Sequence, residues 1–502
     1  MPTTMRSKLI CATLLAASLL AACGTKVVNP VSGREERSVM DEASEIAEGA
    51  KAHQQVLAEY SVLANPRLQT YVDGIGQRLA AQSHRANLKW TFTVLDSPEV
   101  NAFALPGGYI YITRGIMAYL DSEAELAGVV GHEIGHVTAR HSAQRATRQQ
   151  NAGLGVLAAT VLGVALEGAG VRGAADLAMQ AGQGVAAGYV ARYSREQETQ
   201  ADRLGAEYLS RNRYNPNNMV DVIAVLRRQE SFAADQARAE GRPAPQGGGW
   251  LASHPSNDQR LADIRAISAT YAGSYESDGR ARYLAAIDGM DFGESKAQGV
   301  TRGRNFYHEE LDIALTAPPG WRVQNSSAAV ALVNPSGDAG LVVRLVPPAA
   351  GSTHEEIIRN VVKPSEGRID KRSFNGLAAT HFSGSRRNEQ GQAQPVQLTL
   401  VTGPGGRNYL MQYSARDAAA LQRAEPALTV AESSMRALTA ADRTAARPWQ
   451  LRSTPMPRGG FNELARSSPL PAAQAEAQLR LLNAVYGGGA EPAVGQMVKV
   501  VR

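Results

Sequence analysis

Cysteine is almost absent from this sequence. Its 502 residues contain two cysteines, Cys11 and Cys23, and both lie close to the N-terminus. If residues 1–22 are a cleaved targeting segment, as argued below, Cys11 is lost and Cys23 becomes the first residue of the mature chain. Disulfide bonds, thiol catalysis and metal binding by cysteine are then excluded.

Strong net charge and long apolar runs are also lacking. The 52 basic and 47 acidic residues give a formal charge of +5, with no dense block of lysine and arginine, which argues against a nucleic-acid partner. The apolar segments Leu9–Leu20 and Leu154–Leu166 are too short to cross a bilayer as mature helices. No long-period repeat and no heptad run is present. The length and the 44% hydrophobic content are typical of a globular protein with several domains.

The N-terminus has the three regions of a secretory signal. Arg6 and Lys8 precede the apolar run, and Leu20-Ala21-Ala22-Cys23 follows it. This ending resembles the lipobox of bacterial lipoproteins, so we expect residues 1–22 to be a signal peptide and Cys23 to carry lipid. Gly24, in place of aspartate, implies an outer-membrane location by the sorting rule of such lipoproteins. The alternative is a plain secretory signal with a coincidental cysteine.

The mature chain is predicted to be an α+β multidomain protein. We expect a tether over residues 23–38, a mainly helical domain with a small sheet over 39–290, an α+β domain over 305–440 and a small module over 448–502. Apolar periodicity predicts helices over 39–60, 66–83, 114–120, 122–146, 194–211, 216–236 and 258–272. Strands are predicted at 90–94 and 109–112. The Gly/Ala-rich segment 151–190 is interpreted as a close-packed helical hairpin, or alternatively as a mobile lid or membrane-surface element.

The residues best suited to bind a metal and catalyse a reaction form the motif His132-Glu133-Ile134-Gly135-His136. Residues four apart share a helix face, so both imidazoles can reach one metal ion. Glu133 lies one position round the helix and can contact water rather than the metal. Zinc activates a water molecule, and the Glu133 carboxylate takes its proton during attack on a carbonyl carbon.

A third metal ligand is needed to make this motif convincing. The long metzincin pattern requires a glycine and a histidine where this chain has Ala139 and Ser142, and His141 is out of phase and interpreted as structural. A glutamate on a later helix is the other common solution. Glu198 can ligate zinc, and Asp202, four residues later, can accept a hydrogen bond from a ligand histidine. An ordinary charged helix face is the alternative for these two carboxylates.

Five ordered segments extend this pattern over residues 29–268. They are Asn29-Pro30-Val31-Ser32-Gly33-Arg34, Asn101 to Gly108, His132 to His136, Ser194-Arg195 with Glu198 and Ala201-Asp202, and Ser253-His254-Pro255 with Arg260. Together they resemble the M48 family of zinc metallopeptidases, which implies a gluzincin-type domain. The resemblance implies one zinc ion per chain, held by His132, His136 and Glu198, with Glu133 as catalytic base.

The family resemblance implies further roles. The segment ending in Pro106-Gly107-Gly108 leads into an edge strand against which an extended substrate lies, with Asn101 near the substrate-binding wall. His254 is expected to stabilise the developing oxyanion or to cap the metal, and a loop residue before a helix is the alternative. Arg260 is expected to bind the same oxyanion, or to pair with Asp258 or Asp263.

The C-terminal module resembles a degenerate LysM domain, because residues 448–502 are predicted to form a strand, two helices and a strand. Gly459-Gly460-Phe461 replaces the usual Gly-Asp-Thr opening. Peptidoglycan is therefore a candidate partner, and a small stabilising cap is the alternative.

The predicted function is a zinc endopeptidase on the periplasmic face of the outer membrane, acting on unfolded or misassembled envelope proteins. The alternatives are a non-hydrolytic assembly factor, which has no use for Glu133, and a peptidoglycan-associated binding protein or zinc amidase.

Overall fold

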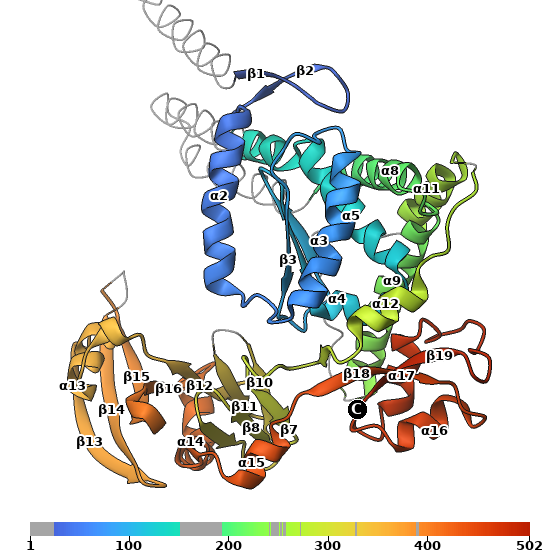
Figure 1. Cartoon of the computed structure of the whole chain (residues 1–502). Helices are drawn as coiled ribbons and strands as arrows, with labels where there is room; N and C mark the ends of the chain where they lie inside the picture. The colour runs from blue at the N-terminus through green and yellow to red at the C-terminus, as the bar shows by residue number, and fades with distance from the viewer. Residues whose placement is uncertain are drawn as a thin grey trace, which may run out of the picture. The chain divides into compact units, whose positions relative to one another are not determined.

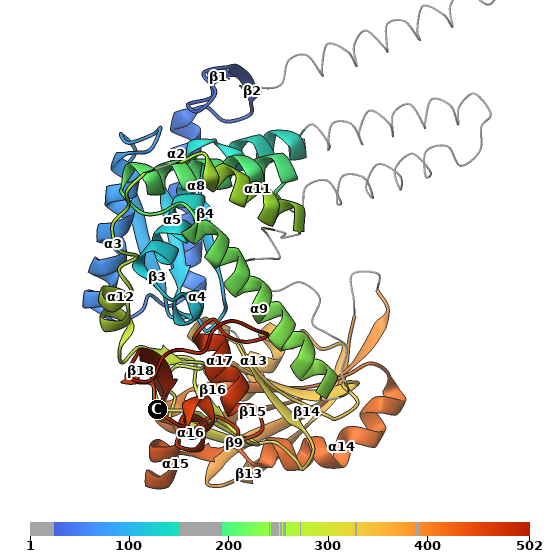
Figure 2. The same ribbon diagram turned by 90° about the vertical axis from the view of Figure 1, so that its right-hand side faces the viewer.

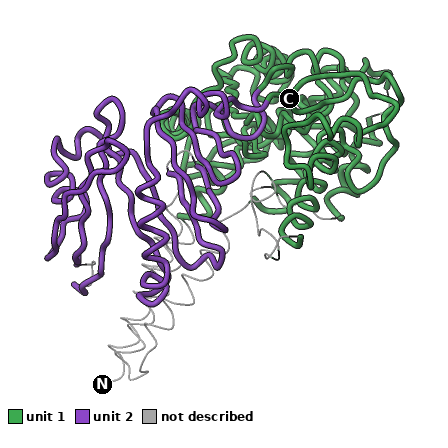
Figure 3. The backbone as a smooth tube through the Cα atoms, turned by 90° about the horizontal axis from the view of Figure 1, so that it is seen from below, with its two compact units in different colours: residues 1–290, 450–502 green, residues 291–449 purple. Residues whose placement is uncertain are grey.

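A computed structural model describes most of the chain beyond the N-terminal segment. The described residues are 25–150, 193–239, 241, 250, 254, 258–271, 273–326, 329–387 and 391–502. The predicted signal peptide, Cys23 and Gly24, the Gly/Ala-rich segment 151–190, and Ser253 and Pro255 lie outside them. The chain forms two compact units, residues 1–290 with 450–502 and residues 291–449 (Figure 3).

The start of the first unit differs from the predicted tether. Residues 25–38 form an antiparallel hairpin of β1 (Thr25–Val28) and β2 (Glu35–Ser38), with Thr25 opposite Ser38. The Asn29 side chain accepts hydrogen bonds from the backbone of Val31 and Ser32, and Gly33 has φ +67°. The Asn-Pro and Gly residues of this polar segment therefore build a turn rather than an extended linker.

The rest of the first unit is mainly helical around a three-stranded sheet (Figures 1 and 2). Its elements are α2 (Glu42–Glu59), α3 (Pro66–Ala81), β3 (Thr91–Leu95), β4 (Ala102–Leu105), β5 (Tyr109–Thr113), α4 (Arg114–Tyr119), α5 (Glu123–Thr138), α8 (Arg195–Arg211), α9 (Asn218–Ala239), α11 (Asp258–Ala269) and α12 (Arg280–Ile287). The sheet order is β3-β5-β4, with β5 parallel to β3 and antiparallel to β4.

Helix α5 is the centre of this unit. Ser122 caps it by accepting a hydrogen bond from the backbone of Glu125, and all 16 of its residues are buried. It packs against α3, α8, α9 and β4. The predicted helix 122–146 is interrupted after Thr138, where Arg140 adopts a left-handed φ of +57°. A helix buried on all sides needs an apolar sequence, so its two histidines and three glutamates stand out.

The C-terminal residues 450–502, predicted as a small module, are part of the first compact unit. They fold as β18 (Trp449–Pro455), α16 (Gly460–Arg466), α17 (Ala475–Leu482) and β19 (Met497–Val501), with β18 antiparallel to β19. The buried Lys499 ammonium donates hydrogen bonds to the carbonyl oxygens of Ala118 and Leu120, at 3.1 and 2.6 Å, and lies 3.6 Å from an oxygen of Asp121. Strand β19 is thereby joined to the turn that precedes α5.

We expect Lys499→Met to destabilise the first unit by about 3 kcal/mol, because two buried carbonyls lose their donor and the Asp121 carboxylate loses a neighbouring cation. Chemical denaturation of the full chain checks this result. Lys26→Met is the matched control, because Lys26 forms an exposed pair with Glu35, and such pairs contribute at most about 1 kcal/mol. An equal loss of stability in the two variants would show that the contacts of Lys499 do not stabilise the turn before α5.

The second unit is an α+β structure. A seven-stranded antiparallel sheet has the order β10-β11-β12-β16-β15-β14-β13, and a four-stranded sheet has the order β17-β9-β8-β7. Helix α14 packs on the larger sheet over an apolar core that includes Leu341, Met411 and Leu428. The bounds are β6 (Asp291–Phe292), β7 (Val300–Arg302), β8 (Asn305–His308), β9 (Ile313–Thr316), β10 (Arg322–Asn325), β11 (Val330–Val333), β12 (Ala339–Leu345), α13 (His354–Ile357), β13 (Glu366–Phe374), β14 (Leu377–Arg387), β15 (Ala393–Thr402), β16 (Asn408–Ala415), α14 (Ala418–Ser433), β17 (Arg436–Ala437) and α15 (Ala440–Ala445).

Within the described part of the chain, no helix has both the length and the apolar character needed to span a membrane.

Candidate metal centre

Helices α5 and α8 approach each other closely because small residues face one another. A Cβ atom at Gly135 would lie 2.9 Å from the carbonyl oxygen of Ala201, and one at Gly205 would lie 3.1 Å from the backbone nitrogen of His132. Any larger side chain at these glycines would push the helices apart. The close approach brings the carboxylates of α8 to the histidines of α5.

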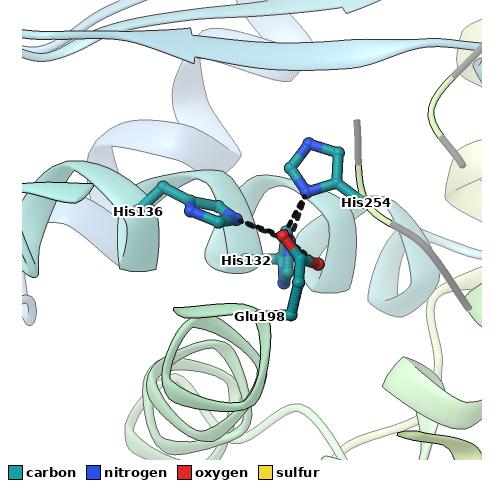
Figure 4. Close-up of side chains that lie close together, drawn as sticks. All are labelled: His132, His136, Glu198 and His254. Carbon is teal, nitrogen blue, oxygen red and sulfur yellow. Dashed lines mark hydrogen bonds and ion pairs between the residues drawn. The ribbon is translucent and has the colours of Figure 1, made fainter. Parts of the chain in front are cut away.

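The three predicted ligands meet at this helix pair (Figure 4). The Nε2 atoms of His132 and His136 are 3.0 Å apart. Oε1 of Glu198 lies 3.5 Å from Nε2 of His136, and its Oε2 lies 3.7 Å from Nε2 of His132. His254 joins them, and one potential ligand atom from each of the four residues lies within 4.8 Å of the others.

The donor set fits a zinc ion. Three imidazoles and a carboxylate are ligands that zinc prefers, and all four side chains are buried. Burial and the neighbouring imidazoles hold the pKa of His136 well below its ordinary value, so its ring is neutral and offers a lone pair. The converging groups present more acceptors than their own protons can satisfy, and a divalent cation resolves that excess. We assign one zinc ion to this cluster.

Asp202 orients a ligand, as the i, i+4 spacing on α8 predicts. Its Oδ1 lies 2.9 Å from Nδ1 of His132, which leaves Nε2 of that ring directed at the cluster. Burial opposes ionisation of Asp202, but Arg260 and His132 outweigh burial and hold its pKa well below the usual range. An ionised carboxylate here fixes the tautomer of the histidine.

Arg260 does not pair with Asp258 or Asp263, one of the alternatives raised from the sequence. Its guanidinium donates two hydrogen bonds of 2.8 Å to Asp202, and Nη1 lies 2.8 Å from Oε2 of Glu198. It also donates to the carbonyl oxygen of His254. Arg260 therefore neutralises two buried carboxylates next to the cluster, and its expected role in binding the oxyanion stays a prediction.

His254 reaches the cluster from a different part of the chain. Its Nδ1 lies 3.0 Å from Oε1 of Glu198 and 3.2 Å from Nε2 of His132, while its Nε2 lies 3.6 Å from Oε1 of Glu133. A catalytic zinc site keeps one position open, and four protein donors close it. Of the two predicted roles, the arrangement in this structure therefore resembles the capped, resting one.

We expect His254→Ala to retain zinc and to raise kcat/KM about tenfold, because a position at the metal centre is freed while His132, His136 and Glu198 remain. Metal analysis and cleavage of an unfolded protein substrate check both parts. Loss of zinc in this variant would instead make His254 an essential ligand. A fall in cleavage with zinc retained would assign it to stabilisation of the oxyanion.

Three further residues complete the surroundings of the centre: His141, which the sequence analysis interpreted as structural, and Tyr193 and Trp250, which it did not select. The Tyr193 ring stacks on His136 at a centroid distance of 4.0 Å. Nδ1 of His141 lies 2.9 Å from Nδ1 of His136, so this histidine supports a ligand. Trp250 donates a hydrogen bond from its indole nitrogen to Oε1 of Glu133. Tyr193 directly precedes Ser194, the N-cap of α8. This position next to a predicted helix start was the one feature of the sequence that could have indicated Tyr193.

The strand that follows the Pro106-Gly107-Gly108 turn is not an edge strand. Strand β5, which follows the turn, is central in the sheet, and the two edge strands are β3 and β4, of which β4 was not predicted. Gly107 and Gly108 have φ of +78° and +98° and form the tight turn between β4 and β5. A four-residue strand between turns shows too little periodicity to be recognised. Asn101 directly precedes β4, and its side-chain oxygen is buried without a hydrogen-bond partner among the described residues.

A histidine pair on one helix and a glutamate on a later helix, with a second glutamate beside the cluster, define a zinc metallopeptidase centre. Residues 66–268 match the family model described as Peptidase family M48. Residues 66–268 therefore form an M48 peptidase domain, and the four residues of the buried cluster lie within that range.

Curated relatives share this region. The chain is 32% identical over 225 residues to the beta-barrel assembly-enhancing protease of Yersinia pestis, which covers 44% of this chain and 43% of that protein. It is 29% identical over 240 residues to the protein of the same name in Escherichia coli K12, covering 47% and 46%. The mitochondrial metalloendopeptidase OMA1 of Schizosaccharomyces pombe is 29% identical over 241 residues, covering 47% and 64%. The matched region thus spans less than half the length of the two bacterial relatives.

Proposed function

We propose that this protein is a zinc endopeptidase that cleaves internal peptide bonds of unfolded or misassembled cell-envelope proteins. The observation that carries the proposal is the buried cluster of His132, His136, Glu198 and His254 with Glu133 beside it. The names of the relatives, a protease that enhances β-barrel assembly and a metalloendopeptidase, support the same chemistry.

Substrate binding is assigned to β4. It is one of the two edge strands of the three-stranded sheet, directly follows Asn101, and pairs with β5 on one side. An extended peptide can add to such an edge through main-chain hydrogen bonds, which requires a substrate segment that is not folded. The endopeptidase specificity for stalled or misfolded chains follows from this requirement. Asn101, at the start of the edge, offers a buried side-chain oxygen to a substrate amide.

The chemical step uses groups with distinct positions. When bound, zinc polarises water and the scissile carbonyl as a Lewis acid. Oε2 of Glu133 is buried without a hydrogen-bond partner among the described residues, so it is the atom that accepts a proton and then delivers it to the leaving amine. His254 must move away from the cluster to admit the substrate carbonyl, because it occupies the position that a catalytic zinc site keeps open.

We place the protein at the periplasmic face of the outer membrane, anchored by lipid on Cys23. The lipobox-like N-terminus supports this location, as do the relatives named for β-barrel assembly. The order β18-α16-α17-β19 in the C-terminal residues supports the LysM-like interpretation, and peptidoglycan is the partner proposed for it. The alternative function is a non-hydrolytic assembly factor, and the presence of Glu133 argues against it.

The test uses protein lacking residues 1–23. We expect one zinc ion per chain and cleavage of casein that stops on chelation and returns when zinc is restored. His136→Ala should lose both zinc and cleavage, whereas His308→Ala, a histidine of the second unit, should keep both. Zinc without cleavage, also in the His254→Ala variant, would support the assembly factor. Absence of zinc would refute the proposal.

A further inference from the structure

Trp250 lies at the centre of the contacts around the metal centre. Its side chain is 1% exposed. The indole stacks on His254 at a centroid distance of 4.6 Å and 20° between planes, and meets His132 edge-on at 5.0 Å. The guanidinium of Arg260 lies 5.4 Å from the indole centroid, within range of a cation–π interaction. The ring therefore contacts one ligand, the capping histidine and the arginine that holds the carboxylates.

The backbone of Trp250 is fixed at both of its polar groups. Its N–H donates to the carbonyl oxygen of Val100 at 2.8 Å, and its own carbonyl oxygen accepts from the N–H of His254 at 2.9 Å. Val100 directly precedes Asn101 and the edge strand. The position of the indole is thus set relative to both the substrate strand and His254, which limits the number of side-chain orientations it can adopt.

The polar atom of the indole is directed at the base. Nε1 donates to Oε1 of Glu133 at 2.9 Å, while Nε2 of His254, at 3.6 Å, is beyond hydrogen-bond distance from the same oxygen. Oε2 of Glu133 has no such partner among the described residues. One carboxylate oxygen is therefore held and the other is left for the reaction.

We propose that Trp250 is a positioning residue that fixes the Glu133 carboxylate through its indole N–H, so that Oε2 is presented as the proton acceptor. The inference rests on the proposed peptidase function. A hydrogen bond to one oxygen restricts rotation of the carboxylate about its terminal torsion, which is otherwise broad. Preorganisation of the base requires such a support, and the metal ligands alone do not supply it.

A purely packing role for Trp250 predicts a different outcome, and Trp90 offers a matched comparison. Trp90 is also buried, in the same unit, and its indole N–H donates to the carbonyl oxygen of Arg85 at 3.1 Å. Trp250→Phe and Trp90→Phe each remove one buried indole hydrogen bond and keep an aromatic ring. Only the hydrogen bond of Trp250 is made to Glu133, the proposed base.

The experiment compares both variants with the wild-type protein in zinc content, kcat and KM. We expect one zinc ion per chain in all three. Trp250→Phe should lower kcat about tenfold with KM within about twofold, and Trp90→Phe should leave kcat unchanged. Equal kcat in the two variants, or a change in KM alone, would overturn the proposal.

A second measurement does not depend on activity. The chain has four tryptophans, and the two variants assign the indole N–H resonances of Trp90 and Trp250 in ¹⁵N-labelled protein. Glu133→Gln should shift the Trp250 resonance and leave that of Trp90 in place. An unshifted Trp250 resonance would refute the contact. If the wild-type protein binds zinc but cleaves nothing, the proposed function fails, while this shift still decides whether Trp250 holds Glu133.

Discussion

Replacing Glu133 with glutamine is expected to lower kcat/KM for an unfolded protein about 10³-fold while one zinc ion per chain remains bound. Glutamine has nearly the same shape and keeps an oxygen that can accept the indole hydrogen bond of Trp250, but its amide cannot take a proton from water. His132, His136 and Glu198 are unchanged, so the metal site keeps its donors. Zinc analysis and cleavage of casein, measured on the same preparation, check both parts.

The control for Glu133→Gln is Glu196→Gln. Glu196 is exposed in the first turn of α8, two residues before the ligand Glu198, so the same chemical change is made close to the centre in sequence but outside it. We expect wild-type cleavage in this variant. Cleavage by Glu133→Gln within tenfold of wild type would show that another group accepts the proton and would remove the assignment of Glu133 as base.

Replacing Arg260 with methionine is expected to lower the free energy of unfolding of the first unit by about 3–5 kcal/mol. The guanidinium lies at 2.8 Å from both Asp202 and Glu198, and all three side chains are buried. Methionine has a similar length but no charge, so two buried carboxylates lose their cation. Denaturation of the full chain, with and without chelator, measures the loss. The zinc-free protein should lose more, because zinc partly replaces the missing charge at Glu198.

Arg227→Met is the matched control for this prediction. Arg227 pairs with Asp258 at 2.8 Å, but these side chains are 41% and 89% exposed, so the pair should contribute less than about 1 kcal/mol. A similar loss of stability in both variants would mean that the buried ion pairs of Arg260 stabilise the protein no more than an exposed pair does. A large loss of cleavage in Arg260→Met with unchanged stability would return Arg260 to the oxyanion role.

Parts of the fold that depend on local pattern were well predicted. Helix α3 begins after Asn65, as the Asn-Pro pair indicates, and its Leu68, Val72 and Leu79 are buried at the predicted spacing. Helix α8 follows Ser194, whose side chain caps it. The association of residues 450–502 with the first unit was not predictable, because a composition change near a linker does not say what a segment packs against. The lone Lys499 in an apolar strand was the available signal.

The sequence by itself determined the catalytic helix. The spacing of His132 and His136, with Glu133 between them, places two ligands and the base on neighbouring faces of any α-helix, because 3.6 residues complete a turn. The i, i+4 spacing of Glu198 and Asp202 has the same origin. These are properties of local geometry and need no tertiary contact.

Only the tertiary structure decided which distant groups act on that helix. The glycines of α5 and α8 let the helices approach until Glu198 reaches the histidines, and the same packing brings Trp250 to Glu133 and Arg260 to Asp202. It also placed β5 at the centre of the sheet and β4 at one of its two edges. Contacts between residues far apart in the chain depend on how whole elements pack, and no periodicity within one element encodes that arrangement.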